Sequence, residues 1–173
     1  MVRQISKIYY QGLRFNAGIV FSIALLEEVF GDIDIYINPK SYENTPETVS
    51  LSYEFQATRF RESGIPVSNF GNIWSEFGLM YCHDDKMLFN LIEYEFVRSI
   101  DCFDLSVDIG IQNHLAINQL NLGFIIDLLN PSSFDDEISI ENSLNEAVNF
   151  SVLILRSIKK WGVEKVLIYS ITR

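Results

Sequence analysis

Carboxylates are the residues of this chain whose number and spacing most clearly suggest a chemistry. The whole chain carries a net charge of −10, and there is no lysine and no arginine between Ser99 and Leu155. The acids of this window are Asp101, Asp104, Asp108, Asp127, Asp135, Asp136, Glu137, Glu141 and Glu146. A one-sided negative surface favours a positively charged partner and repels the phosphates of nucleic acid.

Two of these acids lie on a predicted strand, Cys102 to Ile111, in which apolar and polar residues alternate. Asp104 and Asp108 would project from one side of it, about 13 Å apart. That spacing resembles two phosphates separated by two nucleotides along one strand, roughly 6–7 Å per nucleotide. A protein that occupies the cleft of a cationic nuclease would benefit from such a row. The alternative is the solvated side of an antiparallel sheet, where polar residues are expected.

A second group of acids precedes or opens a long predicted helix. Acids in a first turn complement the positive end of a helix, which accounts for Glu137 and Glu141. Asp135 and Asp136 are less well explained, because four neighbouring acids repel one another. We therefore expect a partner-binding surface that contains Asp104, Asp108, Asp135, Asp136, Glu137 and Glu141, with Asp127 and Asp101 as outer candidates.

Cysteine and histidine are few, and their spacing does not predict a metal site. Cys82, His83, Asp84 and Asp85 are adjacent in the chain, and adjacent residues of a helix or strand do not converge on one ion. A dyad of Cys82 or Cys102 with His83 or His114 stays open, because such pairs form in space. There is no nucleotide-binding, metalloprotease or serine-hydrolase motif. We expect no cofactor, no metal, two free thiols and no enzyme activity.

The elements that must position these residues begin with alternating strands and helices. Ser6 to Leu13 is predicted to be a strand, followed by a helix over 17–30 between the N-cap Asn16 and Gly31. A buried strand fits 17–30 almost as well, because its apolar residues also alternate. Further strands are predicted over Ile33 to Asn38 and Thr48 to Gln56, and Arg59 to Asn72 is predicted to be a loop.

The second half is predicted to end on a long helix and a strand. A helix capped by Asp84 or Asp85 would run to about Ser99, although alternation fits the segment 86–99 nearly as well. The strand from Cys102 would turn at His114 and return over Ala116 to Asp127. A helix from Ser139 to about Trp161 would stop at Gly162, and the last strand would be Glu164 to Thr172.

This order predicts one α+β domain over residues 1–173, with two layers, a mixed or antiparallel sheet and about three helices. The N-terminus shows no secretory signal, and the longest apolar run, Ala17 to Leu26, is too short to span a bilayer. We therefore expect a cytoplasmic protein that needs no membrane. The oligomeric state is left open.

The segment FGDIDIYINPKSYEN, Phe30 to Asn44, resembles a short strand found in some bacterial immunity proteins. The small acidic α+β character of the chain, rich in Ile, Asn, Phe and Tyr, is also similar to immunity proteins of polymorphic toxin and contact-dependent growth-inhibition systems. The resemblance implies tight binding to one toxin domain, often a nuclease with a basic cleft. It transfers no role to any single residue.

Three functions follow as hypotheses. The first is an immunity protein that binds and neutralises a cationic toxin domain through an acidic surface. The second is another interaction module, such as an adaptor or a phage-type protein, with a less basic partner. The third is an enzyme with an unrecognised acidic site, which would gather His83 or His114 with two or more carboxylates in a deep cleft.

Overall fold

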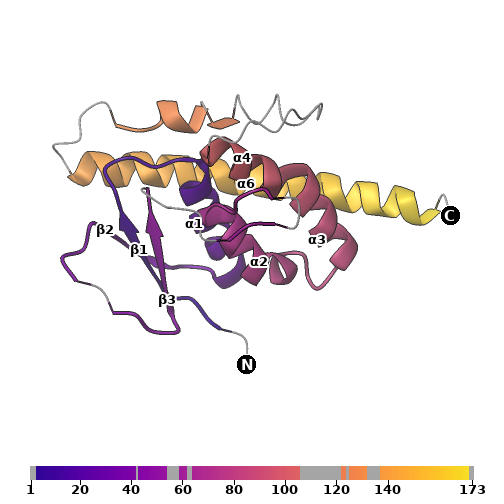
Figure 1. The fold of residues 1–173 in the computed structure, drawn as a ribbon, viewed down its shortest axis with the longest axis horizontal. Helices are drawn as coiled ribbons and strands as arrows, with labels where there is room; N and C mark the ends of the chain where they lie inside the picture. Colours follow the sequence, from indigo (N-terminus) through magenta and orange to yellow (C-terminus); the bar gives the residue numbers. More distant parts are fainter. Residues whose placement is uncertain are drawn as a thin grey trace.

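The fold is taken from a computed structural model. It describes residues 3–41, 43–53, 59–61, 64–105, 122–123, 125–131 and 137–171. The described chain places a small sheet beside a set of helices, with one long helix running past both (Figure 1). The mixed α+β character predicted from the sequence is confirmed, but the described residues contain more helices than the three or so that were predicted.

Three strands form a parallel sheet in the order β2-β1-β3. β1 spans Lys7–Gln11, β2 spans Asp34–Ile37 and β3 spans Thr48–Ser52, so the three predicted strands are confirmed, except that residues 54–56 of the third prediction lie outside the described residues. Tyr9 lies opposite Tyr36 on one side and Ser50 on the other. The predicted mixed or antiparallel pairing is wrong for these strands, because a helical crossover returns the chain from β1 to the start of β2, and an irregular connection returns it from β2 to the start of β3.

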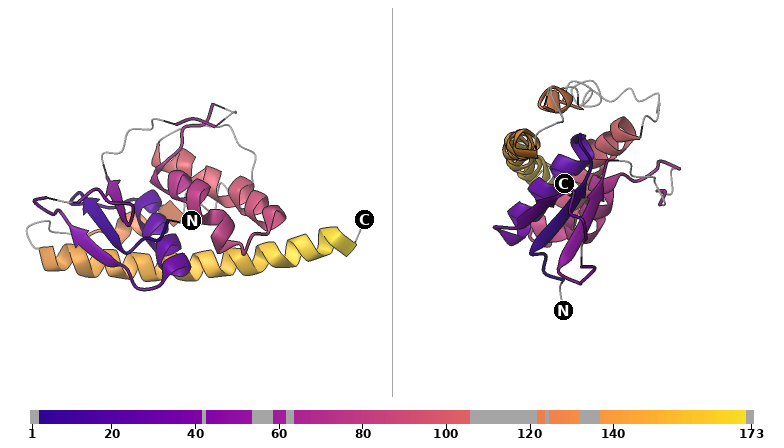
Figure 2. Two further views of the ribbon diagram at one scale, coloured as in Figure 1. Left: turned by 90° about the horizontal axis from the view of Figure 1, so that it is seen from below. Right: turned by 90° about the vertical axis from the view of Figure 1, so that its left-hand side faces the viewer.

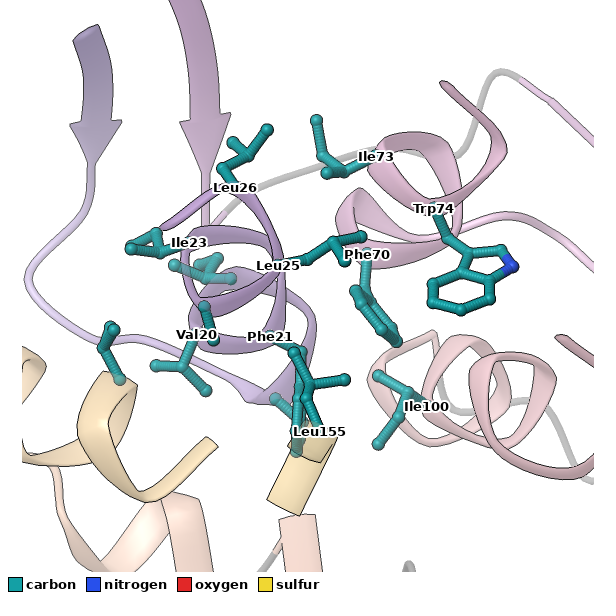
Figure 3. Close-up of a cluster of buried hydrophobic side chains, with 14 of the residues drawn as sticks. Val20, Phe21, Ile23, Leu25, Leu26, Phe70, Ile73, Trp74, Ile100 and Leu155 are labelled. Atoms are coloured by element: carbon teal, nitrogen blue, oxygen red, sulfur yellow. The ribbon is translucent and has the colours of Figure 1, made fainter. Parts of the chain in front are cut away.

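That crossover is α1, Ala17–Phe30, and it is the centre of the core. Every residue from Ala17 to Leu26 is buried, which is why an alternating pattern fitted the segment almost as well as a helical one. The Asn16 side chain accepts a hydrogen bond from the Ile19 amide at 3.0 Å, and Gly31 ends the helix with φ 84°. The prediction of a helix here is confirmed. Figure 3 shows α1 side chains such as Phe21 and Leu25 meeting residues of three other helices.

The next helices pack on α1. α2 spans Asn69–Tyr81 and begins at the N-cap Ser68, so the loop predicted up to Asn72 ends earlier than expected. α3, Lys86–Ile92, continues through a π-helical stretch η1, Glu93–Val97, into α4, Arg98–Asp104. Asp85 caps α3 through the amides of Met87 and Leu88, which confirms the predicted helix start.

The predicted strand from Cys102 is wrong over its described part, Cys102 to Leu105, because α4 continues to Asp104. Ile92, Phe96 and Ile100 are buried at four-residue spacing, and this packing carries the helix past the point where alternation begins. The rest of that strand, 106–111, lies outside the described residues. Of the return strand predicted over Ala116 to Asp127, residues 122–123 and 125–127 are helical, so that prediction is wrong there, and residues 116–121 and 124 lie outside the described residues.

α6, Glu137–Ile171, is the long helix, and it confirms and exceeds the helix predicted over Ser139 to Trp161. Gly162 does not end it. A Cβ on Gly162 would lie 2.5 Å from Leu88 Cδ1, so this glycine allows α6 to approach α3 closely. The predicted final strand is therefore wrong through Ile171. The C-terminal turns of α6 extend beyond the other described elements (Figures 1 and 2).

Hydropathy along the described helices also bears on membranes. None of these helices combines the length and the apolar character that crossing a bilayer requires.

Candidate functional site

Carboxylates gather at both ends of α1, and the two groups differ in environment. At its N-terminal end lie the interior carboxylates, which we define as Asp101 and Asp104 of α4. At its C-terminal end lies the acidic groove, which is lined by Glu27, Glu28, Gly31, Asp32, Asn149, Val152, Leu153 and Arg156.

Asp101 is completely buried and fully bonded. Its Oδ2 atom accepts a hydrogen bond from Arg61 Nη2 at 2.5 Å, and its Oδ1 atom accepts bonds from the backbone amide and hydroxyl of Ser68 at 3.0 and 2.6 Å. Arg61 also pairs with Glu93 of η1. These contacts tie the segment before α2 to α4, so Asp101 stabilises the fold and is not accessible to a partner.

Asp104 belongs to the interior as well. The backbone amide of Gly18 donates to its Oδ2 atom at 2.6 Å, at the first turn of α1. Its Oδ1 atom is buried and has no hydrogen-bond partner among the described residues. Burial raises the pKa of this carboxyl well above its usual range, and the Gly18 amide only partly opposes that effect. Gly18 leaves room for the carboxylate, since a Cβ there would lie 2.1 Å from Oδ2.

The acidic surface predicted from the sequence is therefore not brought together by the described residues. The expectation that Asp101 faces outward is wrong, because this side chain is buried on a helix. Asp104 is on the same helix rather than on a strand, and although the residue is only half-buried, its carboxylate bonds Gly18 and points away from solvent. Asp127 and Glu141 are exposed. Asp108, Asp135 and Asp136 lie outside the described residues, and Glu137 begins α6 with its side chain not described.

The acidic groove lies where the last turn of α1 meets the middle of α6. It is a hollow of about 440 Å³. Glu28 pairs with Arg156, whose Nη2 and Nε atoms donate to Glu28 Oε1 at 2.7 and 3.0 Å. Leu153 is 61% exposed, so the groove combines carboxylates with an accessible apolar side chain.

The negative charge of the groove exceeds its positive charge. Burial makes the largest contribution to raising the pKa of Glu27, and the negative charges of Asp32 and Glu28 raise this pKa further. Within the part of the chain that the structure describes, no lysine or arginine pairs with Glu27 or Asp32. The C-terminal end of a helix is itself negative. The groove is thus suited to accept a cationic side chain.

Glu27, Glu28 and Asp32 were not among the residues predicted from the sequence. They lie before the window without lysine and arginine, and the predicted site was taken from that window. One signal was present: two glutamates occupy the last turn of a predicted helix and an aspartate follows Gly31. Acids at this end oppose the helix dipole, so they carry an energetic cost that calls for an explanation.

Cysteine and histidine form no comparable site. His83 is exposed, and its Nε2 atom lies 3.2 Å from Lys159 Nζ rather than among carboxylates. Cys82 and Cys102 are free and buried, and burial raises their thiol pKa values to about 12 and about 11, which disfavours a nucleophilic thiolate. His114 is not described. Among the described side chains, no group of three or more His, Cys, Asp or Glu could hold a metal ion.

Comparison with known proteins adds no relative: no protein family, curated protein or solved structure matches this chain.

Proposed function

We propose that this chain is a protein-binding domain of the immunity type, which neutralises a cationic toxin domain by binding it at the acidic groove. The observation that carries the proposal is the charge of Glu27 and Asp32, with which no described lysine or arginine pairs, beside the exposed Leu153. This combination is typical of a protein interface, where an apolar contact gives residence time and complementary charge speeds association.

The groove suits a lysine or arginine from the partner. Its volume is of the order of one large side chain with its hydration, and its opening is flanked by Asn149, which can accept a hydrogen bond through its amide oxygen. An entering guanidinium would be held between Glu27 and Asp32 while its methylene groups contact Leu153. Arg156 already shows that this surface pairs a guanidinium with Glu28.

The experiment is a binding measurement against the protein encoded next to this chain in its genome. We expect a complex whose affinity falls steeply between about 50 mM and about 500 mM salt, as screening of exposed charges requires. The double variant Glu27→Lys with Asp32→Lys should weaken binding at least about tenfold, because like charges across an interface are repelled.

A matched control is Glu43→Lys with Glu47→Lys, which makes the same change in net charge at two exposed acids between β2 and β3 that do not line the groove. It should leave the affinity nearly unchanged. The proposal would be abandoned if the neighbouring gene product did not bind, or if the groove variant and the control weakened binding equally. Affinity that does not depend on salt would assign the chain to the alternative class, an adaptor with a less basic partner.

A further inference from the structure

The charges of α6 are divided between its two halves, with acids in the first half and mainly bases in the second. The first half of one copy therefore complements the second half of another copy that runs in the opposite direction. From Glu137 to Leu155 the helix contains only acids among its charged residues, and from Arg156 onward it contains four bases and one acid. The acids are Glu137, Glu141, Glu146 and Glu164, and the bases are Arg156, Lys159, Lys160 and Lys165. Two such helices side by side attract one another only when they are antiparallel.

The side chains that face outward are arranged symmetrically about the middle of the helix. At about 100° per residue, Glu146, Leu153 and Lys160 fall within roughly 20° of one line along α6. That line is opposite the buried side, which includes Leu144 and Leu155. All three residues are exposed, and Leu153 lies seven positions from each of the other two.

We infer that this face of α6 binds a second copy of the same chain, in an antiparallel pair centred on Leu153. In this register Leu153 contacts Leu153 of the second copy on the two-fold axis, and Glu146 of each copy faces Lys160 of the other. Asn142 lies opposite Glu164, eleven positions from the centre on either side and also exposed. The two helix dipoles are then opposed as well, which favours this orientation over a parallel one.

The rest of the described molecule leaves room for such a pair. α6 runs along one side of the other elements, and Figure 2 shows its outer side uncovered by the described segments. The two bodies would then lie on opposite sides of the helix pair. Near the C-terminal end, Leu167 and Ile171 are 57% and 82% exposed, so further apolar surface becomes available for burial.

This inference does not depend on the proposed function, although the two sites share one residue. Leu153 lines the acidic groove and also lies at the centre of the proposed pair. A second copy on this face would cover one rim of the groove, so self-association and partner binding should compete. Glu27 is on α1 and does not take part in the pair, which keeps the tests of the two proposals separate.

Sedimentation velocity on the full chain tests the pairing. We expect a dimer that forms as the concentration rises through roughly 10–100 µM. Lys160→Glu should raise the dissociation constant at least about tenfold, because it places acids opposite acids in both symmetric contacts. Adding Glu146→Lys to the same chain restores opposite charges and should restore the dimer. Lys165→Glu makes the same change in net charge more than about 100° away from the face and should have no effect.

Cysteine cross-linking tests the orientation. Leu153→Cys should form a disulfide between copies, since the two residues meet at the centre. Glu164→Cys alone should not, because an antiparallel pair separates the two copies of this position by about 33 Å along the axis. A chain that stays monomeric, a charge exchange that does not restore the dimer, or cross-linking at both positions would overturn the inference. Binding of a monomeric chain to anionic vesicles would do so too, and would assign this face to a lipid surface.

Discussion

The two ends of α1 use carboxylates in opposite ways. At the N-terminal end, Asp101 and Asp104 lie inside the protein and take hydrogen bonds from Arg61, Ser68 and Gly18. At the C-terminal end, Glu27 and Asp32 line an open groove beside a helix end that repels them. In the first group Asp101 stabilises the fold through its pair with Arg61, whereas the acids of the second group cost the fold some stability. Charge that opposes stability is a better guide to function than charge that is merely abundant.

The largest effect is expected when Arg61, the cation that pairs with Asp101, is removed from the interior. Arg61→Met would leave Asp101 buried without its positive partner and would also leave Glu93 unpaired. Breaking a buried ion pair in this way costs about 3–5 kcal/mol, because an uncompensated charge remains in the interior. Denaturant unfolding at neutral pH measures the change. A loss below about 1 kcal/mol, the usual value for an exposed pair, would show that the interior group does not stabilise the fold.

Asp104 gives the next largest effect and a dependence on pH. Its pKa is raised in the folded state, so the stability it contributes is complete below its unfolded pKa, about 3.9, and is lost as the pH rises through the folded value. Asp104→Asn keeps a neutral group that can accept from Gly18. The variant should therefore gain on the wild type by up to about 1.4 kcal/mol for each pH unit between the unfolded and the folded pKa, and the gain should stay constant above the folded value.

The groups that face Asp104 are Gly18 of α1, the charge of Asp101 on α4 and the charge of Asp127. Unfolding curves of the wild type and the Asn variant at a series of pH values give the difference directly, and effects of other carboxylates cancel in it. Asp34→Asn, at an exposed position of β2 that is not among the charges facing Asp104, serves as the control and should show a smaller slope. Equal stability of the wild type and Asp104→Asn at all pH values would mean that the carboxyl is not held in an unfavourable environment.

The first three strands and α1 could be predicted from the sequence because local residues mark their ends. Asn16 caps the start of α1, and Gly31 ends this helix just before β2.

The prediction failed at Cys102 and at Gly162, where tertiary contacts decide. The alternation after Cys102 is a strand pattern, but packing of Phe96 and Ile100 carries the helix onward. Gly162 has the composition of a helix stop, yet its contact with Leu88 makes it a point of close packing.

The same limit applies to the candidate site. A bias toward acids is visible in the sequence, but exposure depends on which side of α4 faces α1, and no local pattern fixes that. The sequence therefore predicts Asp101 and Asp104 as surface charges, and only the fold shows that Arg61 donates to Asp101 and the Gly18 amide donates to Asp104. The acidic groove needs residues from α1 and α6 that are more than a hundred positions apart, so it could not be predicted from spacing.

The smallest expected effect sharpens the comparison at the other end of α1. Glu27→Gln removes a charge that burial, Asp32 and Glu28 all disfavour. Because its pKa is raised on folding, the wild type loses stability relative to this variant as the pH rises above about 4.5. The side chain is half-exposed, so solvent screening limits the gain of the variant at neutral pH to roughly 0.3–1 kcal/mol.

Glu28→Gln is the matched change at the next position, and it should not stabilise the chain because it breaks the pair with Arg156. Thermal unfolding of both variants at neutral and acidic pH separates them. A Glu27→Gln variant that is less stable than the wild type at neutral pH would mean that Glu27 already has a favourable partner, and the two ends of α1 would no longer differ in kind.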